Sequence, residues 1–419
     1  MFRTWLPAAL VLGAGLPAAT RAADFALKDG DTVVFLGDSI TAARTYGKVV
    51  ENYTLLRYSD RKVKFVNAGR GGDTAAGGLR RLEADVFAHR PAVVTVAYGV
   101  NDIGWGTKAD AEHKRQYLDG VRGIVEACVK RGVRVYVCSA AATAEDPAKA
   151  ETGFLQAMCD DGMALSKSLG GQAIDVQRAM RGIQKRVLAA NEAVADKAKR
   201  DSLHAPDGVH LTDLGQLAMA FAILKGLGAP ADVSAAAIDA AQGTVIRADG
   251  CKVTDVRAKD GTVEFTRLDD GLPFNYGIFY GLNYRYVPVP DELNRYLLTV
   301  TGLPAGRYEV TADGRGLGAF TAGQLAAGVN VASATADPWR PGGPWDAQAD
   351  LLKHLTDARH EVAQANSEAG VTLPGSRVAD DLARQATALD ERIVEAQRAA
   401  ASPRPYRFVI RPAPDGKKK

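Results

Sequence analysis

Short apolar runs alternate with longer helix-periodic stretches from residue 31 to about residue 226. Apolar runs bounded by turn residues are typical of strands buried on both faces, and apolar residues spaced by three and four are typical of helices. This alternation predicts a parallel sheet covered by helices on both faces. The predicted strands lie at 32–36, 63–67, 92–98, 132–138 and 172–175. The predicted helices lie at 43–58, 75–87, 111–130, 148–168, 178–200 and 212–226.

The pattern changes after the last of these helices. Residues 229–241 are rich in alanine and are predicted to form a connector. Short alternating runs with Asp-Gly and Pro-Ala-Gly turns follow at 243–331, which predicts a small antiparallel β module. Apolar residues return to helical spacing at 346–401 with a break at 370–375, which predicts a hairpin of two helices. Residues 406–411 alternate again and are expected to return as an edge strand.

The N-terminus has the three regions of a secretory signal peptide. Arg3 precedes an apolar stretch at 5–16, small residues follow, and cleavage is expected after Ala22 or Ala23. The apolar stretch is shorter than the ~20 residues of a membrane span and is interrupted by proline and glycine. We therefore expect an exported protein, periplasmic or extracellular, with no membrane span.

Length and charge limit the organisation and the partners. At 419 residues and 47% hydrophobic content, the chain is long enough for one large domain with smaller units. The predicted segments are a signal peptide at 1–23, an α/β domain at 24–228, a β-rich module at 229–335, a helical hairpin at 336–402, and a terminal strand with a basic tail at 403–419. The formal net charge is +3 with both signs interspersed, so nucleic acid is not an expected partner.

The cysteines give no sign of a metal site. They are Cys128, Cys138, Cys159 and Cys251, and no Cys-x-x-Cys motif is present to bind zinc. An even number of cysteines in an exported chain allows disulfides. Because Cys128 and Cys138 lie in apolar stretches, buried thiols are the favoured interpretation.

The most informative apolar run stops at a small turn that carries a serine. Residues 33–41 read Val-Val-Phe-Leu-Gly-Asp-Ser-Ile-Thr, so a buried strand is followed by Gly37, which allows a sharp turn, and by a helix beginning near Ser39. A serine at the carboxyl edge of a parallel sheet has its Oγ in a crevice and its N–H at a helix N-terminus. It can therefore act as a nucleophile and supply one oxyanion donor. The competing interpretation is a helix N-cap.

A serine nucleophile needs a base, which restricts the choice among six histidines. Four are predicted to lie at a strand entry, early in a helix or in the late hairpin: His89, His113, His354 and His360. His204 and His210 remain as candidate bases. Asp207 lies three residues before His210 on a loop, where its carboxylate can accept from one ring nitrogen while the other nitrogen faces the serine. The competing interpretation of this pair is ordinary polar loop residues.

Four short blocks occur in order along the predicted α/β domain. They are Gly-Asp-Ser-Ile-Thr at 37–41, Asn-Ala-Gly-Arg-Gly-Gly-Asp-Thr at 67–74, Gly-Val-Asn-Asp at 99–102 and Asp-Gly-Val-His at 207–210. Each block alone is a weak signal, but together they resemble the SGNH, or GDSL-type, hydrolases, over roughly residues 31–226. This resemblance implies a flavodoxin-like fold with three layers around a parallel sheet, and no metal or cofactor. The first block has Ile-Thr where the family signature has leucine.

The resemblance assigns roles residue by residue. Ser39 matches the nucleophile, and Asp207 with His210 matches the rest of a Ser-His-Asp triad. Ser39, Gly72 and Asn101 match the three donors of the oxyanion hole. These five residues are therefore the expected catalytic and oxyanion-hole residues.

Two of the donors keep a second interpretation. Gly72 is one of several turn glycines, so Gly69 or Gly71 is an alternative donor. Asn101 offers a neutral side-chain donor, but it and Asp102 are also candidate helix N-caps.

Three neighbouring residues are expected to have supporting roles. Asp38 is expected to form the turn that places the serine loop, and Asp73 is expected to cap the helix that follows it. Trp105 either stacks on a sugar ring or fills its loop.

These assignments predict an exported serine esterase acting on a small-molecule or polysaccharide ester. The leading substrate is an O-acetyl group on a carbohydrate, because similar exported SGNH proteins are often carbohydrate esterases. Activity is expected to fall below about pH 6.5, where a free histidine gains a proton. The sequence gives no indication of the oligomeric state.

Three alternatives stay open. They are a lipid or thioester hydrolase that uses the same residues, a metal-dependent phosphoesterase, and a non-catalytic carbohydrate-binding protein. Aromatic residues in the β module form either a sugar platform or part of a core. They are Phe274, Tyr276, Phe279, Tyr280, Tyr284 and Tyr286.

Overall fold

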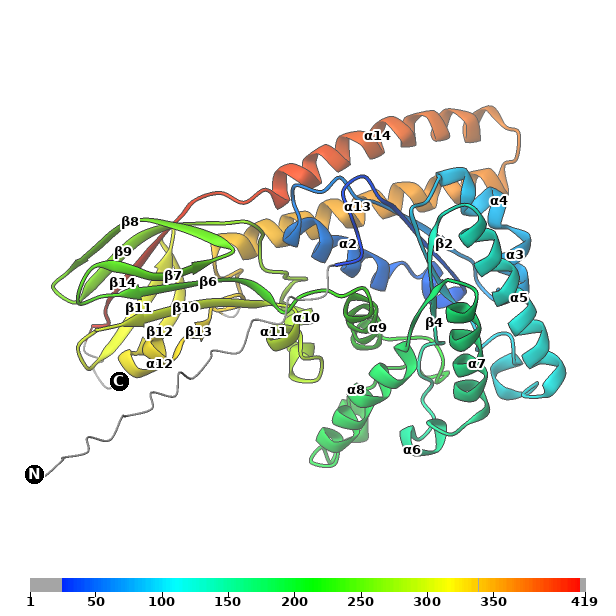
Figure 1. The fold of residues 1–419 in the computed structure, drawn as a ribbon, viewed down its shortest axis with the longest axis horizontal. Coiled ribbons are helices and arrows are strands. Elements are labelled where there is room, and N and C mark those ends of the chain that lie inside the picture. Colours follow the sequence, from blue (N-terminus) through cyan, green and yellow to red (C-terminus); the bar gives the residue numbers. More distant parts are fainter. Residues whose placement is uncertain (1–24, 338, 415–419) are drawn as a thin grey trace, which may run out of the picture.

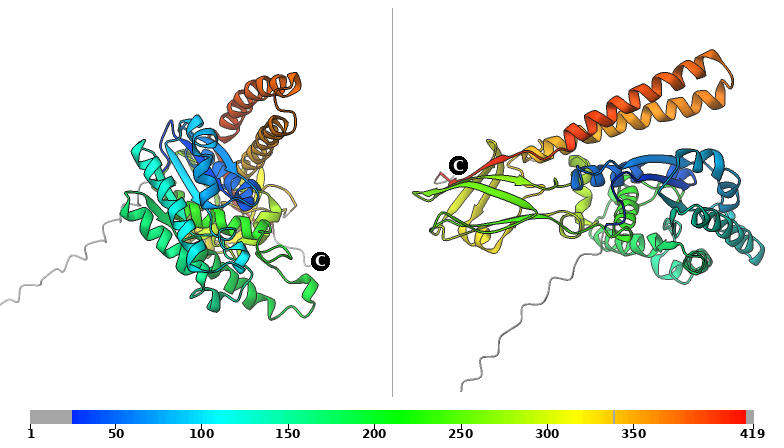
Figure 2. Two further views of the ribbon diagram at one scale, coloured as in Figure 1. Left: turned by 90° about the vertical axis from the view of Figure 1, so that its right-hand side faces the viewer. Right: turned by 45° about the horizontal axis from the view of Figure 1, so that its top comes forward.

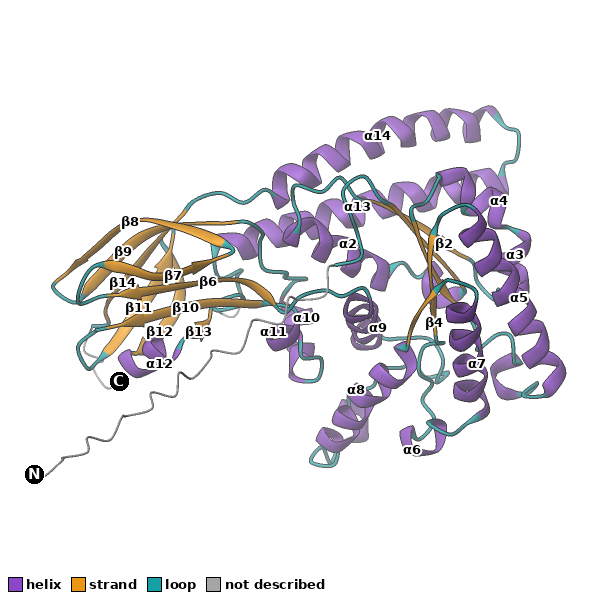
Figure 3. Cartoon of the chain, in the orientation of Figure 1, coloured by secondary structure: helices purple, strands orange, loops and turns teal. Residues whose placement is uncertain are grey.

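The computed structural model describes residues 25–337 and 339–414. The predicted signal peptide at 1–23 and the end of the basic tail lie outside the described residues. Figure 1 shows an α/β domain, a β module beside it, and two long helices that run from the module across the α/β domain. Figure 3 separates the same parts by helix and strand.

Five parallel strands form the central sheet in the order β2-β1-β3-β4-β5. This is the strand order of flavodoxin-like folds, so the predicted fold class is confirmed. Central strands β1 and β3 are almost entirely buried, which explains their continuous apolar sequences. The strands are β1 (Thr32–Gly37), β2 (Lys64–Gly69), β3 (Val93–Ala97), β4 (Arg134–Cys138) and β5 (Gln172–Ile174).

Helices cover both faces of this sheet and complete three layers. One core cluster joins the sheet to α2 (Thr45–Arg57), α8 (Val176–Asn191) and α9 (Asp213–Gly226). A second cluster joins the other face to α3 (Ala75–Arg80), α5 (Ala111–Lys130) and α7 (Phe154–Ser168). Shorter elements are α1 (Ser39–Ala42), α4 (Leu82–Asp85), α6 (Pro147–Ala150), and the 3₁₀ turns η1 (Phe87–His89), η2 (Gly104–Gly106) and η3 (Lys197–Lys199).

The β module contains two sheets, with strand orders β13-β10-β6-β7 and β12-β11-β14-β9-β8. The first sheet consists of β6 (Asp232–Asp239), β7 (Thr244–Asp249), β10 (Arg295–Thr301) and β13 (Val329–Asn330). The second consists of β8 (Cys251–Lys259), β9 (Thr262–Asp269), β11 (Arg307–Ala312), β12 (Arg315–Thr321) and β14 (Tyr406–Pro412). Short helical segments in the module are α10 (Ile278–Gly281), η4 (Leu282–Arg285), α11 (Val289–Glu292) and α12 (Ala322–Ala327).

Three expectations about this module are wrong. The predicted connector at 229–241 contains strand β6, because its small side chains alternate toward the core. Strand β10 pairs with β6 in parallel, so the module is mixed rather than antiparallel. The last strand, expected at an edge, lies between β11 and β9, and its side chains Tyr406, Phe408 and Ile410 are fully buried.

The helical hairpin is formed by α13 (Pro344–Thr372) and α14 (Arg377–Ala401), which Figure 2 shows running alongside the α/β domain. A buried carboxylate ties it to α2. Glu51 lies 3.0 Å from Arg359 Nη1 and 3.0 Å from His360 Nε2. Burial alone would raise the pKa of Glu51, but the attraction of Arg359 and the hydrogen bond of His360 hold it at about 2.

The β module and the α/β domain share a hydrophobic core. Tyr53 on α2 packs against Phe274 with ring centroids 6.4 Å apart, and Arg57 donates to the Asp232 and Leu293 carbonyls. Of the six aromatic residues considered as a sugar platform, four are buried: Phe274, Tyr276, Tyr280 and Tyr286. Tyr284 is partly buried, and the side chain of Phe279 is not described. The four buried side chains therefore belong to the core and do not form an exposed platform.

Two further features concern the described residues. Within residues 25–337 and 339–414, no helix is both long enough and apolar enough to cross a bilayer. All four cysteines are thiols, and burial raises the pKa of Cys128, Cys138 and Cys159 to about 12.

Candidate active site

Ser39 is the first residue of α1, at the carboxyl end of β1. The preceding residue, Asp38, is the N-cap and accepts a hydrogen bond from the Ile40 N–H at 2.9 Å. The Ser39 hydroxyl is therefore not needed as a cap, and its Oγ lies 2.9 Å from His210 Nε2. Gly37 is required here for space, because a Cβ at this position would lie 2.8 Å from the Ala97 carbonyl oxygen and closer still to the Thr41 side chain.

The Asp207-to-His210 loop folds back on itself as the sequence predicts. Asp207 Oδ2 lies 2.6 Å from His210 Nδ1, while Oδ1 accepts the backbone N–H groups of Val209 and His210 at 2.9 Å each. Gly208 adopts φ +73°, which a residue with a side chain rarely does. The hydrogen bond to His210 and the two backbone N–H groups lower the pKa of Asp207 to about 2. A continuous chain of contacts thus runs from a carboxylate through an imidazole to a serine.

The second candidate base, His204, does not join this chain. Its ring is buried, and Nε2 lies 2.8 Å from the Ala142 carbonyl oxygen. Burial lowers its pKa, which favours the neutral ring. The structure therefore brings His210, and not His204, to Ser39.

The glycine-rich loop after β2 leaves two backbone donors open. The Gly69 N–H donates to Asn67 Oδ1, and a Cβ on Gly69 would collide with the Ala42 backbone. Among the described residues, neither the Gly71 nor the Gly72 N–H has a hydrogen-bond partner. Gly72 has φ +71° and open space at its missing side chain. Backbone conformation, rather than crowding, explains the glycine at this position.

Asn101 follows β3 and does not cap a helix. Its Nδ2 donates to the Asp73 carbonyl at 3.0 Å, and its Oδ1 accepts from Trp105 Nε1 at 2.8 Å. Because Asp73 immediately follows Gly72, the hydrogen bond from Asn101 to the Asp73 carbonyl links the loops that carry these two predicted donors. Asp102 Oδ1 accepts a hydrogen bond from the Ala75 N–H at 2.9 Å, which connects the loop after β3 to the start of α3.

Sequence analysis missed Arg81, a buried side chain that holds the loops of the site together. Its Nε lies 2.7 Å from Asp73 Oδ2, and its Nη2 donates to the Gly37 carbonyl at 3.1 Å and to the Tyr98 hydroxyl at 2.9 Å. Asp73 therefore pairs with Arg81 and does not cap α3 as expected. No local pattern in the sequence distinguishes Arg81 from an exposed arginine, because its partners lie on separate segments of the chain.

Thr74 takes the capping role that was expected of Asp73, since its Oγ1 accepts the Gly77 N–H at 3.2 Å. The predicted helix at 75–87 is also interrupted, with α3 ending at Arg80 and α4 beginning at Leu82. The break coincides with the inward-pointing Arg81 side chain.

Two other buried carboxyl groups belong to the loops that carry Ser39 and Asn101. Burial raises the pKa of Asp38 to about 6, against the opposing effects of the Ile40 N–H and His210. Burial likewise raises the pKa of Asp102 to about 6. Both groups can therefore gain a proton in mildly acidic solution.

Replacement Asp38→Asn is expected to change stability in a pH-dependent way. The pKa of Asp38 is higher in the folded state than in the unfolded chain, so folding takes up a proton between about pH 6 and pH 4. The contribution of Asp38 to the free energy of unfolding of the wild type therefore rises as the pH falls through that window. Asparagine keeps an oxygen for the Ile40 N–H but does not titrate. The variant should match or exceed the wild-type melting temperature at pH 7 and lose that advantage at pH 5.

Because pH 5 lies one unit below a pKa of about 6, the difference in stability between the two proteins should change by about 1.4 kcal/mol from pH 7 to pH 5. Thermal unfolding of both proteins at the two pH values measures it. An identical difference in melting temperature at pH 7 and pH 5 would contradict a buried, titrating carboxyl at position 38.

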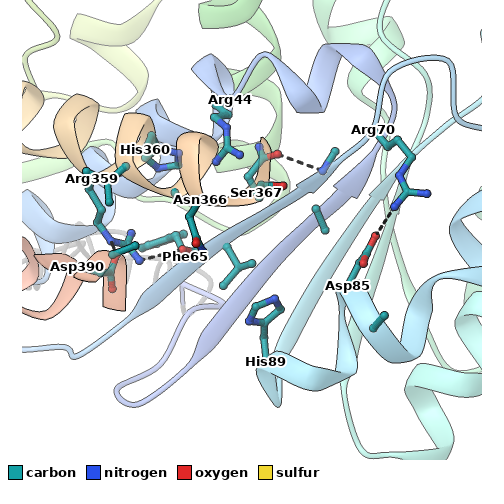
Figure 4. A pocket seen from close by; sticks show the side chains of 18 of the residues that line it. Arg44, Phe65, Arg70, Asp85, His89, Arg359, His360, Asn366, Ser367 and Asp390 are labelled. Carbon is teal, nitrogen blue, oxygen red and sulfur yellow. Dashed lines mark hydrogen bonds and ion pairs between the residues drawn. The ribbon is translucent and has the colours of Figure 1, made fainter. Parts of the chain in front are cut away.

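A large groove lies between strand β2 and the helical hairpin (Figure 4). Its volume is about 1160 Å³, and its lining includes Arg44, Arg70, Arg359 and Asp390. Ser39, Asp207 and His210 do not line it. The contacts among these three residues are instead at the surface, where the side chains of His210 and Asp207 are 39% and 37% exposed.

Comparison with known proteins agrees with this architecture. Residues 35–218 match the model of the GDSL-like lipase/acylhydrolase family, a range that includes all five predicted site residues. No curated protein matches the chain. A gut microbial diltiazem-metabolizing enzyme has a similar structure, with a TM-score of 0.78 and 21% sequence identity, over 92% of this chain and 98% of that chain. Because the similarity extends over 92% of this chain, the two proteins share a fold that includes the β module and the helical hairpin.

Two further structures match about half of this chain. One is described as a GDSL-like lipase from Parabacteroides merdae, with 18% identity, a TM-score of 0.40, and coverage of 49% of this chain and 98% of that chain. The other is an acetylxylan esterase from Geobacillus stearothermophilus, with 20% identity, a TM-score of 0.40, and coverage of 48% and 96%.

Proposed function

We propose that the protein is an exported serine esterase that removes O-acetyl groups from a carbohydrate. Its α/β domain belongs to the GDSL-like lipase/acylhydrolase family, whose members are hydrolases. The observation that carries the proposal is the series of contacts from Asp207 through His210 to Ser39, at 2.6 Å and 2.9 Å. This is the geometry that a triad needs to activate a serine.

The reaction is acyl transfer to water. Ser39 Oγ attacks the ester carbonyl while His210 Nε2 takes the hydroxyl proton, and the carbonyl oxygen becomes an oxyanion. The N–H groups of Ser39 and Gly72 and the Asn101 amide stabilise that charge. The ester C–O bond then breaks, and His210 gives its proton to the leaving alcohol. Water repeats the same steps on the acyl-enzyme and releases the acid.

Exposure of the site supports a carbohydrate substrate over a lipid. His210 and Asp207 lie at the surface, and Trp105 beside them is 48% exposed. An open site of this kind admits an ester on a polymer without enclosing an acyl chain. The signal-peptide pattern at 1–23 supports export, which would bring the enzyme to extracellular polysaccharide.

Acetate release distinguishes the proposed substrate class from the others. The full-length mature protein would be incubated with acetylated xylan, acetylated pectin, short nitrophenyl esters and a lysophospholipid, and each product would be measured. We expect release of acetate from at least one polysaccharide. Cleavage of the lysophospholipid alone would overturn the carbohydrate assignment, and no reaction of Ser39 with a fluorophosphonate would overturn the serine esterase.

Replacement of Asn101 tests the oxyanion hole. Asn101→Asp keeps an oxygen acceptor for Trp105 but removes the amide donor, and Asn101→Ala removes both groups. Loss of one preorganised donor lowers kcat by about 10²- to 10³-fold, with KM little changed. We expect both variants to show this loss in nitrophenyl acetate hydrolysis.

The control for charge is Gln385→Glu, which adds the same negative charge at an exposed position on α14. This control is expected to retain wild-type kinetics. A loss with Asn101→Asp but not with Asn101→Ala would indicate charge repulsion instead of a missing donor.

A further inference from the structure

The loop that follows Asn101 holds a tryptophan in an unusual backbone conformation. Gly104, Trp105 and Gly106 have successive φ values of +54°, +56° and +93°. Such values are common for glycine but rare for tryptophan, and side chains held in this way are concentrated at functional sites. Backbone hydrogen bonds from Trp105 to the Val100 carbonyl and from Gly106 to the Ile103 carbonyl hold the loop in place.

The Trp105 side chain contacts two predicted site residues at once. Its Nε1 donates to Asn101 Oδ1 at 2.8 Å. Its ring meets the His210 ring edge to face, with centroids 5.6 Å apart and an interplanar angle of 71°. Despite these contacts, 48% of Trp105 is exposed, so the ring is not simply filling the loop.

The contact with Asn101 determines which end of the amide is the donor. An amide has one acceptor oxygen and two N–H donors on its nitrogen. Trp105 uses the oxygen, and one N–H goes to the Asp73 carbonyl at 3.0 Å. The remaining N–H is then free for the oxyanion. A flipped amide would place its nitrogen against the indole N–H, which cannot accept a hydrogen bond.

We infer that Trp105 is a positioning residue that holds Asn101 as an oxyanion donor, and that its exposed ring binds the sugar of the leaving alcohol. This inference rests on the proposed function. His210 delivers its proton to the leaving alcohol, and Trp105 lies against His210. A pyranose ring attached through the scissile ester therefore comes beside the indole, whose face packs against sugar C–H groups.

A double-mutant cycle tests the positioning role. Trp105→Phe keeps an aromatic ring but has no N–H, so we expect kcat for nitrophenyl acetate to fall about tenfold with KM unchanged. In an Asn101→Ala background the same replacement should cause no further loss, because the amide that it positions is absent. Wild-type kcat in Trp105→Phe, or losses that multiply in the double variant, would overturn this role.

Leaving-group dependence tests the sugar subsite. Trp105→Ala is expected to lower kcat/KM for acetylated xylobiose about tenfold more than for ethyl acetate, whose alcohol has no ring. Trp105→Phe should keep most of this preference because it keeps a ring face. Equal losses on the two esters in Trp105→Ala would overturn the subsite.

The matched control is Trp339→Ala, since Trp339 is 81% exposed and follows the β module outside the predicted site. It should leave both esters unaffected. Circular dichroism and thermal unfolding confirm that each variant is folded. A wild-type protein that hydrolyses no ester would overturn the proposed function together with this inference, whereas an active wild type with unaffected Trp105 variants overturns the inference alone.

Discussion

Replacement of Ser39 by alanine is expected to lower kcat for ester hydrolysis by about 10⁶-fold. In the proposed mechanism, the hydroxyl oxygen at this position forms the acyl-enzyme after His210 Nε2, 2.9 Å away, takes its proton. The residual rate comes from substrate binding and from the oxyanion donors. Hydrolysis of nitrophenyl acetate measures the loss, and the variant should also fail to form a fluorophosphonate adduct.

Ser168→Ala provides a control for this experiment. Ser168 is an exposed serine at the end of α7, and its hydroxyl donates to the Leu165 carbonyl at 2.8 Å. The control should retain full activity and labelling. An adduct on folded Ser39→Ala, or phosphatase activity that a chelator abolishes, would contradict the assignment of Ser39 as the nucleophile.

Replacement Asp207→Asn is expected to lower kcat by about 10⁴-fold while leaving the fold intact. In the wild type, the carboxylate accepts from His210 Nδ1, which leaves Nε2 without a proton and able to take one from Ser39. The asparagine amide nitrogen can instead donate to Nδ1. The proton then resides on Nε2, the wrong tautomer for a base.

Hydrogen bonds hold the pKa of Asp207 at about 2, so this carboxylate stays charged across the pH range of an activity assay. The loss in Asp207→Asn should therefore have the same size from about pH 6 to pH 9. Asp110→Asn is a matched control, because Asp110 makes the same carboxylate contact, at 2.8 Å, with a histidine three residues later. Activity of Asp207→Asn within tenfold of that control would contradict an orienting role for Asp207.

Strands and helices of the α/β domain were predictable because their signals are local. The helix predicted at 111–130 has these bounds in the structure, with Asp110 as its N-cap and buried Val121, Ile124 and Cys128 on one face. The apolar runs gave all five parallel strands. By contrast, strand β6 was missed because alanine has low strand propensity, and only packing in the module makes that segment extended.

The residues of the site also differ in whether their contacts are local in the chain and therefore predictable. Asp207 and His210 were predictable as a pair because a contact over three residues depends on the loop itself, with Gly208 providing the positive φ. Arg81 was not predictable, since its partners lie on three other segments and no local pattern indicates that its charge is buried. Trp105 was left with two interpretations because its hydrogen bond depends on the orientation of Asn101.

By itself, the sequence determined a three-layer domain of parallel strands, a serine at the edge of its sheet, and an aspartate that can orient a histidine. Tertiary structure alone decided that His210 meets Ser39 across 171 residues, that β14 enters the middle of a sheet, and that the Trp105 indole donates to the Asn101 amide. The physical reason is that propensity and periodicity act between near neighbours in the chain, whereas these contacts depend on how separate strands and loops pack.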